Sequence, residues 1–307
     1  MAGSVSHMSK HAAVAGPAVS ELLGEAATAI SRSRAIDTWH PSLSRYDSEE
    51  LMVAVLGTGL TPRLRRSPLP SEQRRRFATM VARRIAGEPV ARILGHFTFR
   101  GLDLVVGDGV FVPRSSSELL AGEAVKALRR RRPPRRAVDV ATGAGPVALA
   151  MASEVPDAEV WGLDISGAAV KLGRRNAGRL GIANVRFRVS DLVDALPRSW
   201  RGALDVITIH PPYVARADLR ILPREIRDFE PLQSLTDNSD DGLGLVRRLA
   251  VDSHLWLRPG GVVLVEVGTY LSRSAQAALR RAGLSDVTWK RDSLGVTRVV
   301  AGRRPRL

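Results

Sequence analysis

The 307-residue sequence contains no cysteine, and this absence excludes several kinds of chemistry. Disulfide bonds, zinc sites built from thiolates and a cysteine nucleophile are all impossible without it. The chain also lacks any apolar run near the roughly eighteen residues that would cross a bilayer, and it has no apolar stretch typical of a secretory signal. We therefore expect a cytoplasmic protein that does not span a membrane.

Aromatic residues are also scarce, at 5% of the chain, although the formal net charge is +15. The arginines that carry most of this charge gather in short runs at 63–66, 74–76, 129–132 and 135–136. Such runs can bind nucleic acid or an acidic protein. Aromatic side chains for base stacking are not interleaved with them, however. We therefore expect a solvated basic surface and no nucleic-acid partner. The six histidines show no metal-ligand spacing, so no metal is expected.

Four segments of different character follow one another along the chain. Residues 1–18 have the composition of a disordered leader. Residues 19–94 carry apolar side chains three and four apart, which predicts a small helical bundle. Two β-type runs flank a Gly-Asp-Gly sequence, which predicts a β-hairpin linker over 95–114. From 115 to 307 strands and helices alternate, which is typical of a Rossmann-like, parallel, doubly wound α/β sheet.

The expected strands of the last segment are 137–141, 159–164, 185–190, 204–209 and 261–267, with a final pair at 286–291 and 297–302. Helices are expected between them, for example at 167–180 and 242–257. The helix after the hairpin is expected to begin at a serine cap supplied by Ser115, Ser116 or Ser117.

A nucleotide-type site is predicted where the early strands end. Gly143 and Gly145 let the backbone turn sharply between a strand and a helix, and they let a ligand approach closely. Asp139, Asp164 and Asp191 end three successive strands, and ligands of open α/β sheets bind at such ends. An acidic residue at the spacing of Asp164 binds ribose hydroxyls in dinucleotide folds. No Walker lysine follows the glycines, which disfavours ATP or GTP hydrolysis and leaves NAD possible on this pattern alone.

A rigid corner follows the fourth expected strand. Proline cannot continue a central strand, so His210, Pro211, Pro212 and Tyr213 form a stiff turn with an aromatic ring at its tip. A neutral imidazole has one acceptor nitrogen and is basic near neutral pH. The corner therefore predicts a catalytic turn beside the nucleotide-type site.

Two long stretches carry a resemblance to a known family. These are "ARRIAGEPVARILGHFTFRGLDLVVGDGVFVPR" (82–114) and "HPPYVARADLRILPREIRDFEPLQSL" (210–235). They resemble the joining segment and the acceptor loop of the HemK-like family, the glutamine N5-methyltransferases of peptide-chain release factors. That family belongs to the class I S-adenosylmethionine-dependent methyltransferases. The resemblance covers nearly the whole chain from about residue 20, and it implies that 19–94 is a substrate-binding domain and that 115–307 binds the cofactor.

The resemblance also implies S-adenosylmethionine as the cofactor and assigns roles to the site. Asp164 would hold the ribose, Asp191 would hold the adenine, and Gly143 and Gly145 would pass under the methionine part. The expected cofactor-binding residues are Asp139, Thr142, Gly143, Gly145, Asp164, Ile165, Asp191, Leu192 and His210. The expected catalytic residues are His210, Pro211, Pro212 and Tyr213. The expected substrate-binding residues are Phe97, Phe99, Arg114 and Tyr213.

Three positions depart from the family's pattern. His210 stands where the family has asparagine, Ala141 stands for the first glycine of Asp-x-Gly-x-Gly, and 113–118 reads Pro-Arg-Ser-Ser-Ser-Glu where the family has Pro-Arg-Pro-x-Thr-Glu. In the family, the asparagine oxygen and a prolyl carbonyl accept the two N–H groups of the glutamine amide. A histidine base suits a hydroxyl, an amine or an acidic carbon better than a neutral amide.

These departures lead us to expect a methyltransferase acting on the N, O or C nucleophile of a small molecule, with His210 as base or positioning group. The alternative is the family reaction itself, on a release-factor protein. A binding module that keeps the fold without catalysis is a third reading, because a Cβ at Ala141 could weaken cofactor binding. Glu266 is expected to face the cofactor side. The oligomeric state stays open.

Overall fold

A computed structural model describes residues 16–36 and 42–306 of the chain. The chain folds as two compact units, Met1–Val90 and Ala91–Leu307. The expected leader at 1–18 lies outside the described residues except for its last three, where Ala18 pairs with Pro68. Within the described residues, no helix is both long and apolar enough to cross a membrane.

The first unit is helical, as the spacing of its apolar residues predicts. Its helices are α1 (Val19–Ser31), α2 (Ser42–Leu56), α3 (Pro62–Arg66) and α4 (Ser71–Ile85). Apolar side chains of α1, α2 and α4 form its core, among them Leu23, Ile30, Leu51, Met52, Phe77 and Val81. The predicted helical bundle is therefore confirmed. The predicted role of 19–94 in substrate binding and the predicted boundary at 94 stay predictions.

A short helix, α5 (Val90–Leu94), precedes an antiparallel hairpin of β1 (His96–Phe99) and β2 (Leu102–Val105). The hairpin turns at Arg100 and Gly101, which both have positive φ, at 48° and 80°. Two-residue hairpin loops favour positive φ at both positions. The predicted hairpin is confirmed, but the predicted turn at Gly-Asp-Gly is wrong. Arginine gives no sequence signal for this conformation, which Arg100 adopts while its N–H donates to Glu118 Oε1 at 3.1 Å.

Strands and helices alternate through the rest of the second unit. They are α6 (Ser117–Arg129), β3 (Arg135–Val140), α7 (Pro146–Glu154), β4 (Ala158–Asp164), α8 (Gly167–Leu180), β5 (Val185–Val189), β6 (Leu204–Ile209), α10 (Gly244–Trp256), β7 (Leu257–Glu266), α11 (Ser272–Arg281), β8 (Ser285–Arg291) and β9 (Thr297–Arg303). Shorter helical turns are η1 (Arg198–Trp200), η2 (Arg216–Ile221), α9 (Arg224–Arg227), η3 (Leu232–Ser234) and η4 (Thr269–Leu271).

The seven strands form one sheet in the order β5-β4-β3-β6-β7-β9-β8. Neighbouring strands from β5 to β7 run parallel, whereas β9 is antiparallel to both β7 and β8. The predicted doubly wound sheet is confirmed, but an all-parallel sheet is wrong for the final pair. Only a short turn joins β8 to β9, and strands joined so closely must run antiparallel.

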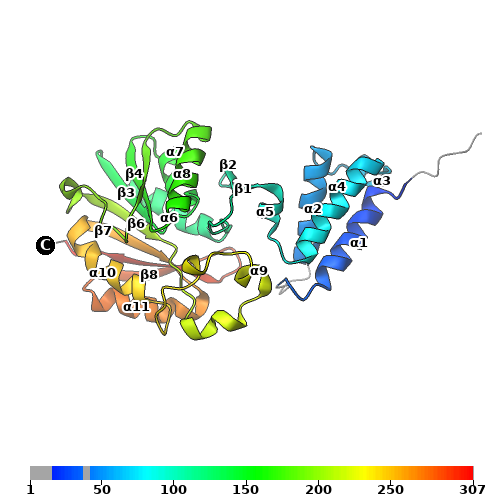
Figure 1. Cartoon of the computed structure of the whole chain (residues 1–307). Coiled ribbons are helices and arrows are strands. Elements are labelled where there is room, and N and C mark those ends of the chain that lie inside the picture. Colours follow the sequence, from blue (N-terminus) through cyan, green and yellow to red (C-terminus); the bar gives the residue numbers. More distant parts are fainter. Residues whose placement is uncertain (1–15, 37–41, 307) are drawn as a thin grey trace, which may run out of the picture. The chain divides into compact units, whose positions relative to one another are not determined.

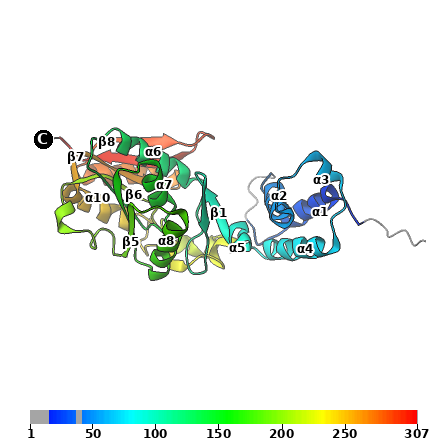
Figure 2. The ribbon, with the colours of Figure 1, turned by 90° about the horizontal axis from the view of Figure 1, so that it is seen from above.

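Helices cover both faces of this sheet. Figure 1 shows α6, α7 and α8 on one side and α10 and α11 on the other, and Figure 2 looks onto the α6, α7 and α8 side from above. Along β7, Val262 and Leu264 pack with the first group of helices, and Val263 and Val265 pack with the second. Because both faces are buried, the strand reads as a continuous apolar run.

The parallel strands all end at one edge of the sheet, so the residues that follow them meet there. The turn after β3, the ends of β4 and β5, and the His210 corner after β6 are neighbours in the strand order. The fold therefore brings together residues that lie far apart in the sequence.

Candidate active site

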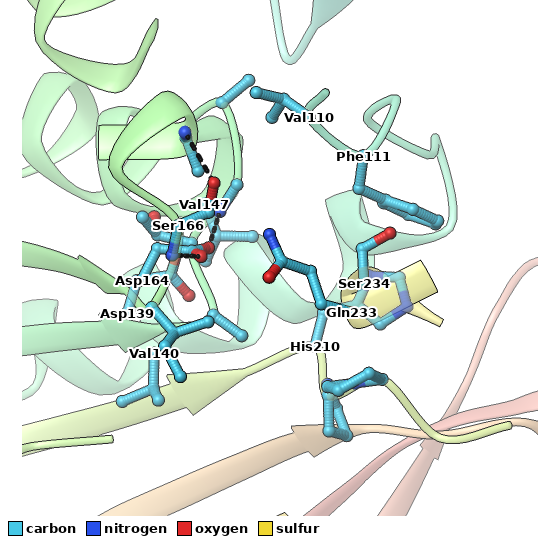
Figure 3. Close-up of a pocket in the computed structure, with 18 of the residues that line it drawn as sticks. Val110, Phe111, Asp139, Val140, Val147, Asp164, Ser166, His210, Gln233 and Ser234 are labelled. Atoms are coloured by element: carbon cyan, nitrogen blue, oxygen red, sulfur yellow. Dashed lines mark hydrogen bonds between the residues drawn. The ribbon is translucent and has the colours of Figure 1, made fainter. Parts of the chain in front are cut away.

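A pocket opens at this edge of the sheet, within the second unit. Most of the predicted site residues line it: Arg114, Asp139, Thr142, Gly143, Asp164, Ile165, Asp191, Leu192, His210, Pro211 and Pro212. Figure 3 shows Asp139, Asp164 and Ser166 on one side of the pocket and Phe111, Gln233, Ser234 and His210 on the other. On the second side, Phe111, Gln233 and Ser234 belong to loops that cover the strand ends, whereas His210 belongs to the corner after β6.

Asp139 links the end of β3 to the following turn and to β6 beneath the pocket. Its carboxylate accepts hydrogen bonds from Thr142 Oγ1 at 2.6 Å and from Thr208 Oγ1 at 2.7 Å, and the side chain is buried. Burial raises the pKa of Asp139 to about 7. Both of its oxygens already hold a partner, so it fixes the turn from which the pocket floor is built.

The two glycines of the turn after β3 have different roles. Gly143 has φ of 56° and an open side where a Cβ would meet no atom within 4 Å, so its backbone offers room to a ligand. Gly145, with φ of 87°, would place a Cβ 2.8 Å from the ring of Phe187. Gly145 does not line the pocket, and packing of α7 on the sheet requires this glycine. That it passes under a ligand stays a prediction. Ala141, the departure from the family motif, lines the pocket with φ of 52°.

The acids after β4 and β5 face the same pocket. Asp164 accepts from the N–H of Gly143 at 2.8 Å and from the N–H of Ser166 at 2.9 Å, and burial raises its pKa. Each carboxylate oxygen has a further lone pair available for a hydroxyl group. Asp191 accepts from Arg248 at 2.8 Å and stays half exposed. Acidic acceptors beside the open face of Gly143, with the apolar Ile165 and Leu192 nearby, suit a ligand with both a sugar and a base.

His210 is the best-fixed side chain of the corner. Its ring stacks on Tyr213, with centroids 5.7 Å apart at an angle of 26°, and it meets the edge of Phe111 at 5.6 Å. Its Nδ1 lies 3.3 Å from Ser117 Oγ and 3.7 Å from Glu266 Oε2. The imidazole is therefore held on several sides at the rim of the pocket.

Tyr213 stands behind His210 and does not line the pocket. It is half-buried against the core between the sheet and α10, and burial is the main cause of its raised pKa. The carbonyl of Tyr213 passes so close to Gly242 that a Cβ there would collide with it. The Tyr213 ring supports the imidazole of His210, and the expectation that Tyr213 packs on a planar acceptor stays a prediction.

The outer wall of the pocket is a loop clamped by Glu230. This buried carboxylate accepts from Arg114 at 2.8 Å and from the N–H of Val112 at 3.1 Å, and burial raises its pKa. The contacts join the segment after the hairpin to the loop that carries η3, from which Gln233 reaches into the pocket (Figure 3). Nothing in the sequence indicated that Glu230 would join these two segments or that Phe111 would line the pocket.

Phe99 is fully buried in the core and Phe97 packs against it, and neither lines this pocket. Hairpin packing accounts for both rings, and their contact with a substrate stays a prediction. The N-cap position of α6 is Ser116, one of the three expected serines, although its side chain makes no capping hydrogen bond. Ser116 donates to Glu266 Oε1 at 2.8 Å and Ser117 faces His210, so these serines belong to the site. Among the residues described, no group of three or more His, Asp or Glu side chains could hold a metal ion.

Family models match both units of the chain. A "Methyltransferase domain" model matches residues 134–240, and a "PrmC N-terminal domain" model matches residues 40–95. Together they cover the region of the strand-end site and most of the helical unit.

Similar proteins are named release factor glutamine methyltransferase. That of Bordetella pertussis is 38% identical over 264 residues, which is 85% of this chain and 96% of the relative. That of Burkholderia pseudomallei is 35% identical over 270 residues, which is 86% of this chain and 93% of the relative. A solved protein-(glutamine-N5) methyltransferase (release factor-specific) from Alicyclobacillus acidocaldarius matches with a TM-score of 0.39 and 24% identity, covering 65% of this chain and 98% of that one.

Proposed function

This chain belongs to the HemK family, that of the release factor glutamine methyltransferases, and is an S-adenosylmethionine-dependent methyltransferase, and we propose that its methyl acceptor is a glutamine side chain of a peptide-chain release factor. The observation that carries this proposal is the extent of the likeness. It runs through the helical unit, the strand-end turns and the His210 corner, and includes almost the full length of relatives named for a protein acceptor.

A small-molecule acceptor is the second candidate. It was the first expectation from the sequence, because an imidazole at position 210 suits a more acidic or more basic nucleophile than a neutral amide. Against it stands the helical unit, which matches the "PrmC N-terminal domain" model. The relatives' names support the protein acceptor over the small molecule.

The pocket residues fit S-adenosylmethionine, which supplies a methyl group already activated on a sulfonium. We propose that Asp164 accepts hydrogen bonds from the ribose hydroxyls through the lone pairs that Gly143 and Ser166 leave free. Asp191 would accept from the adenine amino group beside its bond to Arg248. The open face of Gly143 would lie against the methionine part, with Ile165 and Leu192 on the apolar sides of the base.

The His210 corner would then align the acceptor amide with the methyl group. A glutamine amide is a poor nucleophile because its nitrogen lone pair is delocalised into the carbonyl. Pro211 and Pro212 have no N–H groups and fix the turn, so a prolyl carbonyl stays free to accept one amide N–H. His210 would accept the other. Fixed alignment of two reacting groups is worth up to roughly 7–11 kcal/mol, and the two acceptors would supply it at the pocket rim.

Labelled methyl transfer to two acceptor pools tests the proposal. The full chain is incubated with methyl-labelled S-adenosylmethionine and either a purified release factor or the small-molecule fraction of a cell extract, and products are identified by mass spectrometry. We expect label on one glutamine side chain of the release factor. A release factor with that glutamine replaced is the control. Label in the small-molecule fraction alone would overturn the protein acceptor.

A further inference from the structure

The register of the sheet sets a carboxylate beside the imidazole of the corner. Ile209 of β6 pairs with Val265 of β7, so the next residues, His210 and Glu266, come side by side where the strands end. Glu266 is 3% exposed. Its Oε1 accepts from Ser116 Oγ at 2.8 Å, which fixes the carboxylate.

The other oxygen of Glu266 is the unusual one. Oε2 is buried and has no hydrogen-bond partner among the described residues, and it lies 3.7 Å from His210 Nδ1. Ser117 Oγ approaches the same nitrogen at 3.3 Å. A buried oxygen without a donor is costly, so a proton on the facing nitrogen is favoured.

The imidazole cannot easily turn to exchange its two nitrogens. Tyr213 stacks on one face and Phe111 meets the ring edge-on, while Arg114 lies 4.8 Å from the centre of the Phe111 ring. The charged and titratable groups around this turn include Glu266, Tyr213 and Arg114, and Tyr270 and Arg298 also act on Tyr213. The charge of Glu266 reaches this turn, because it adds to burial in raising the pKa of Tyr213.

We propose that Glu266 is a positioning residue that keeps the proton of neutral His210 on Nδ1, so that Nε2 offers a lone pair to one N–H of the acceptor amide. An ionised carboxylate can only accept hydrogen bonds, so an Nδ1–H facing Oε2 is attracted and an Nδ1 lone pair is repelled. Nε2 then takes the place of the asparagine oxygen in the family's acceptor corner. This inference rests on the proposed glutamine acceptor.

With Nε2 unprotonated, each bond and each proton of the methyl transfer is accounted for. The amide nitrogen bonds to the methyl carbon as the bond from that carbon to sulfur breaks, with its electron pair left on sulfur. The nitrogen then gives up one proton. Nε2 is the base that takes it, and Glu266 offsets the positive charge that results on the ring. The proton passes to solvent when the product leaves.

A double-mutant cycle tests the role of Glu266. Glu266→Gln removes the charge but keeps the size, and its amide group no longer favours one tautomer. We expect this substitution to lower kcat on release factor about tenfold or more, but less than the roughly 10²–10⁴-fold of a base removed outright, because His210 remains. In the His210→Asn background, where the side-chain oxygen needs no tautomer, the same substitution is expected to change kcat less than about threefold. Glu159→Gln, at a half-exposed carboxylate of β4 that lies 3.7 Å from Arg136, is the control for loss of one charge. Equal losses in both backgrounds would overturn the inference.

The ¹⁵N chemical shifts of the histidine ring give a second readout that needs no acceptor. The signals of His210 are assigned from their loss in His210→Asn. We expect a protonated Nδ1 and an unprotonated Nε2 in the wild-type protein, and a mixture in Glu266→Gln. A wild-type ring protonated at Nε2 would overturn the inference even if Glu266→Gln fails to fold. If the release factor is not the acceptor, the wild type gives no methylated release factor, but the ¹⁵N shifts still show a protonated Nδ1. Failure of the proposed function and failure of this inference are therefore distinguishable.

Discussion

Replacing Asp164 by alanine tests the geometry proposed for the cofactor. The carboxylate sits at the end of β4, is bonded to the N–H groups of Gly143 and Ser166, and keeps one lone pair on each oxygen for a ribose hydroxyl. Hydrogen bonds to a charged group are each worth about 1.5–3 kcal/mol. Loss of two such bonds is about 3–6 kcal/mol, and each 1.4 kcal/mol is tenfold in affinity. We therefore expect S-adenosylmethionine to bind at least roughly 100-fold more weakly.

The same substitution also strips two backbone donors of their acceptor. Each unsatisfied N–H costs about 1–3 kcal/mol unless water replaces the carboxylate. The stability of Asp164→Ala is therefore measured first by urea unfolding, and calorimetric titration with S-adenosylmethionine is carried out where the variant is folded. Asp164→Asn keeps one oxygen acceptor and should bind with intermediate affinity.

Asp194→Ala is the matched control for this experiment. It removes an exposed carboxylate that follows β5 but lies outside the pocket lining, so cofactor affinity should not change. If folded Asp164→Ala binds the cofactor within about threefold of the wild type, the assignment of Asp164 to the ribose is wrong.

Three further substitutions test the turn after β3. Ala141→Gly relieves a left-handed alanine that costs about 1–2 kcal/mol, offset by about 0.4–1 kcal/mol of added chain entropy. Urea unfolding should show a gain between zero and about 1.6 kcal/mol, and a loss would contradict the strain. Gly145→Ala places a Cβ against Phe187 at positive φ and should destabilise the second unit by roughly 2–4 kcal/mol. The control Gly178→Ala places a Cβ in open space within a helix and should raise the free energy of unfolding by about 0.5–1 kcal/mol. Burial raises the pKa of Asp139 from 3.8 to about 7, so the folded state binds the proton more tightly than the unfolded state. The contribution of Asp139 to stability is therefore full below pH 3.8 and is lost as pH rises through 7. The slope that Asp139 adds is at most about 1.4 kcal/mol per pH unit, and it should be missing from pH-dependent unfolding of Asp139→Asn; identical slopes in both proteins would refute it.

The strand-end acids could be predicted because the rule that places them is local. Asp139, Asp164 and Asp191 each lie in or directly after a strand that the sequence marks by a run of apolar residues. Parallel strands end at one edge, so no knowledge of packing is needed to bring these carboxylates together. The same reasoning found the His210 corner, where two prolines end a central strand.

The sequence does not show contacts that depend on packing against another element. The ring of Tyr213 packs in the core beside α10 and stacks on His210. Phe187 from β5 occupies the space beside Gly145. The hairpin turn at Arg100 was missed because Glu118, on a helix that follows, satisfies its N–H. In each case the deciding partner lies on another element.

The strand order explains why a histidine can stand where the family has asparagine. Sequence reasoning identified His210 as a departure and judged it as a free imidazole, in which either Nδ1 or Nε2 can carry the proton. The sheet removes that choice, because the pairing of β6 with β7 sets Glu266 beside Nδ1 and α6 adds Ser117 to the same side. A ring held in this way leaves the lone pair of one nitrogen, Nε2, for the pocket. Judged with these neighbours, the substitution keeps a hydrogen-bond acceptor where the family has asparagine and adds a base, and it agrees with a glutamine acceptor better than the isolated residue suggested.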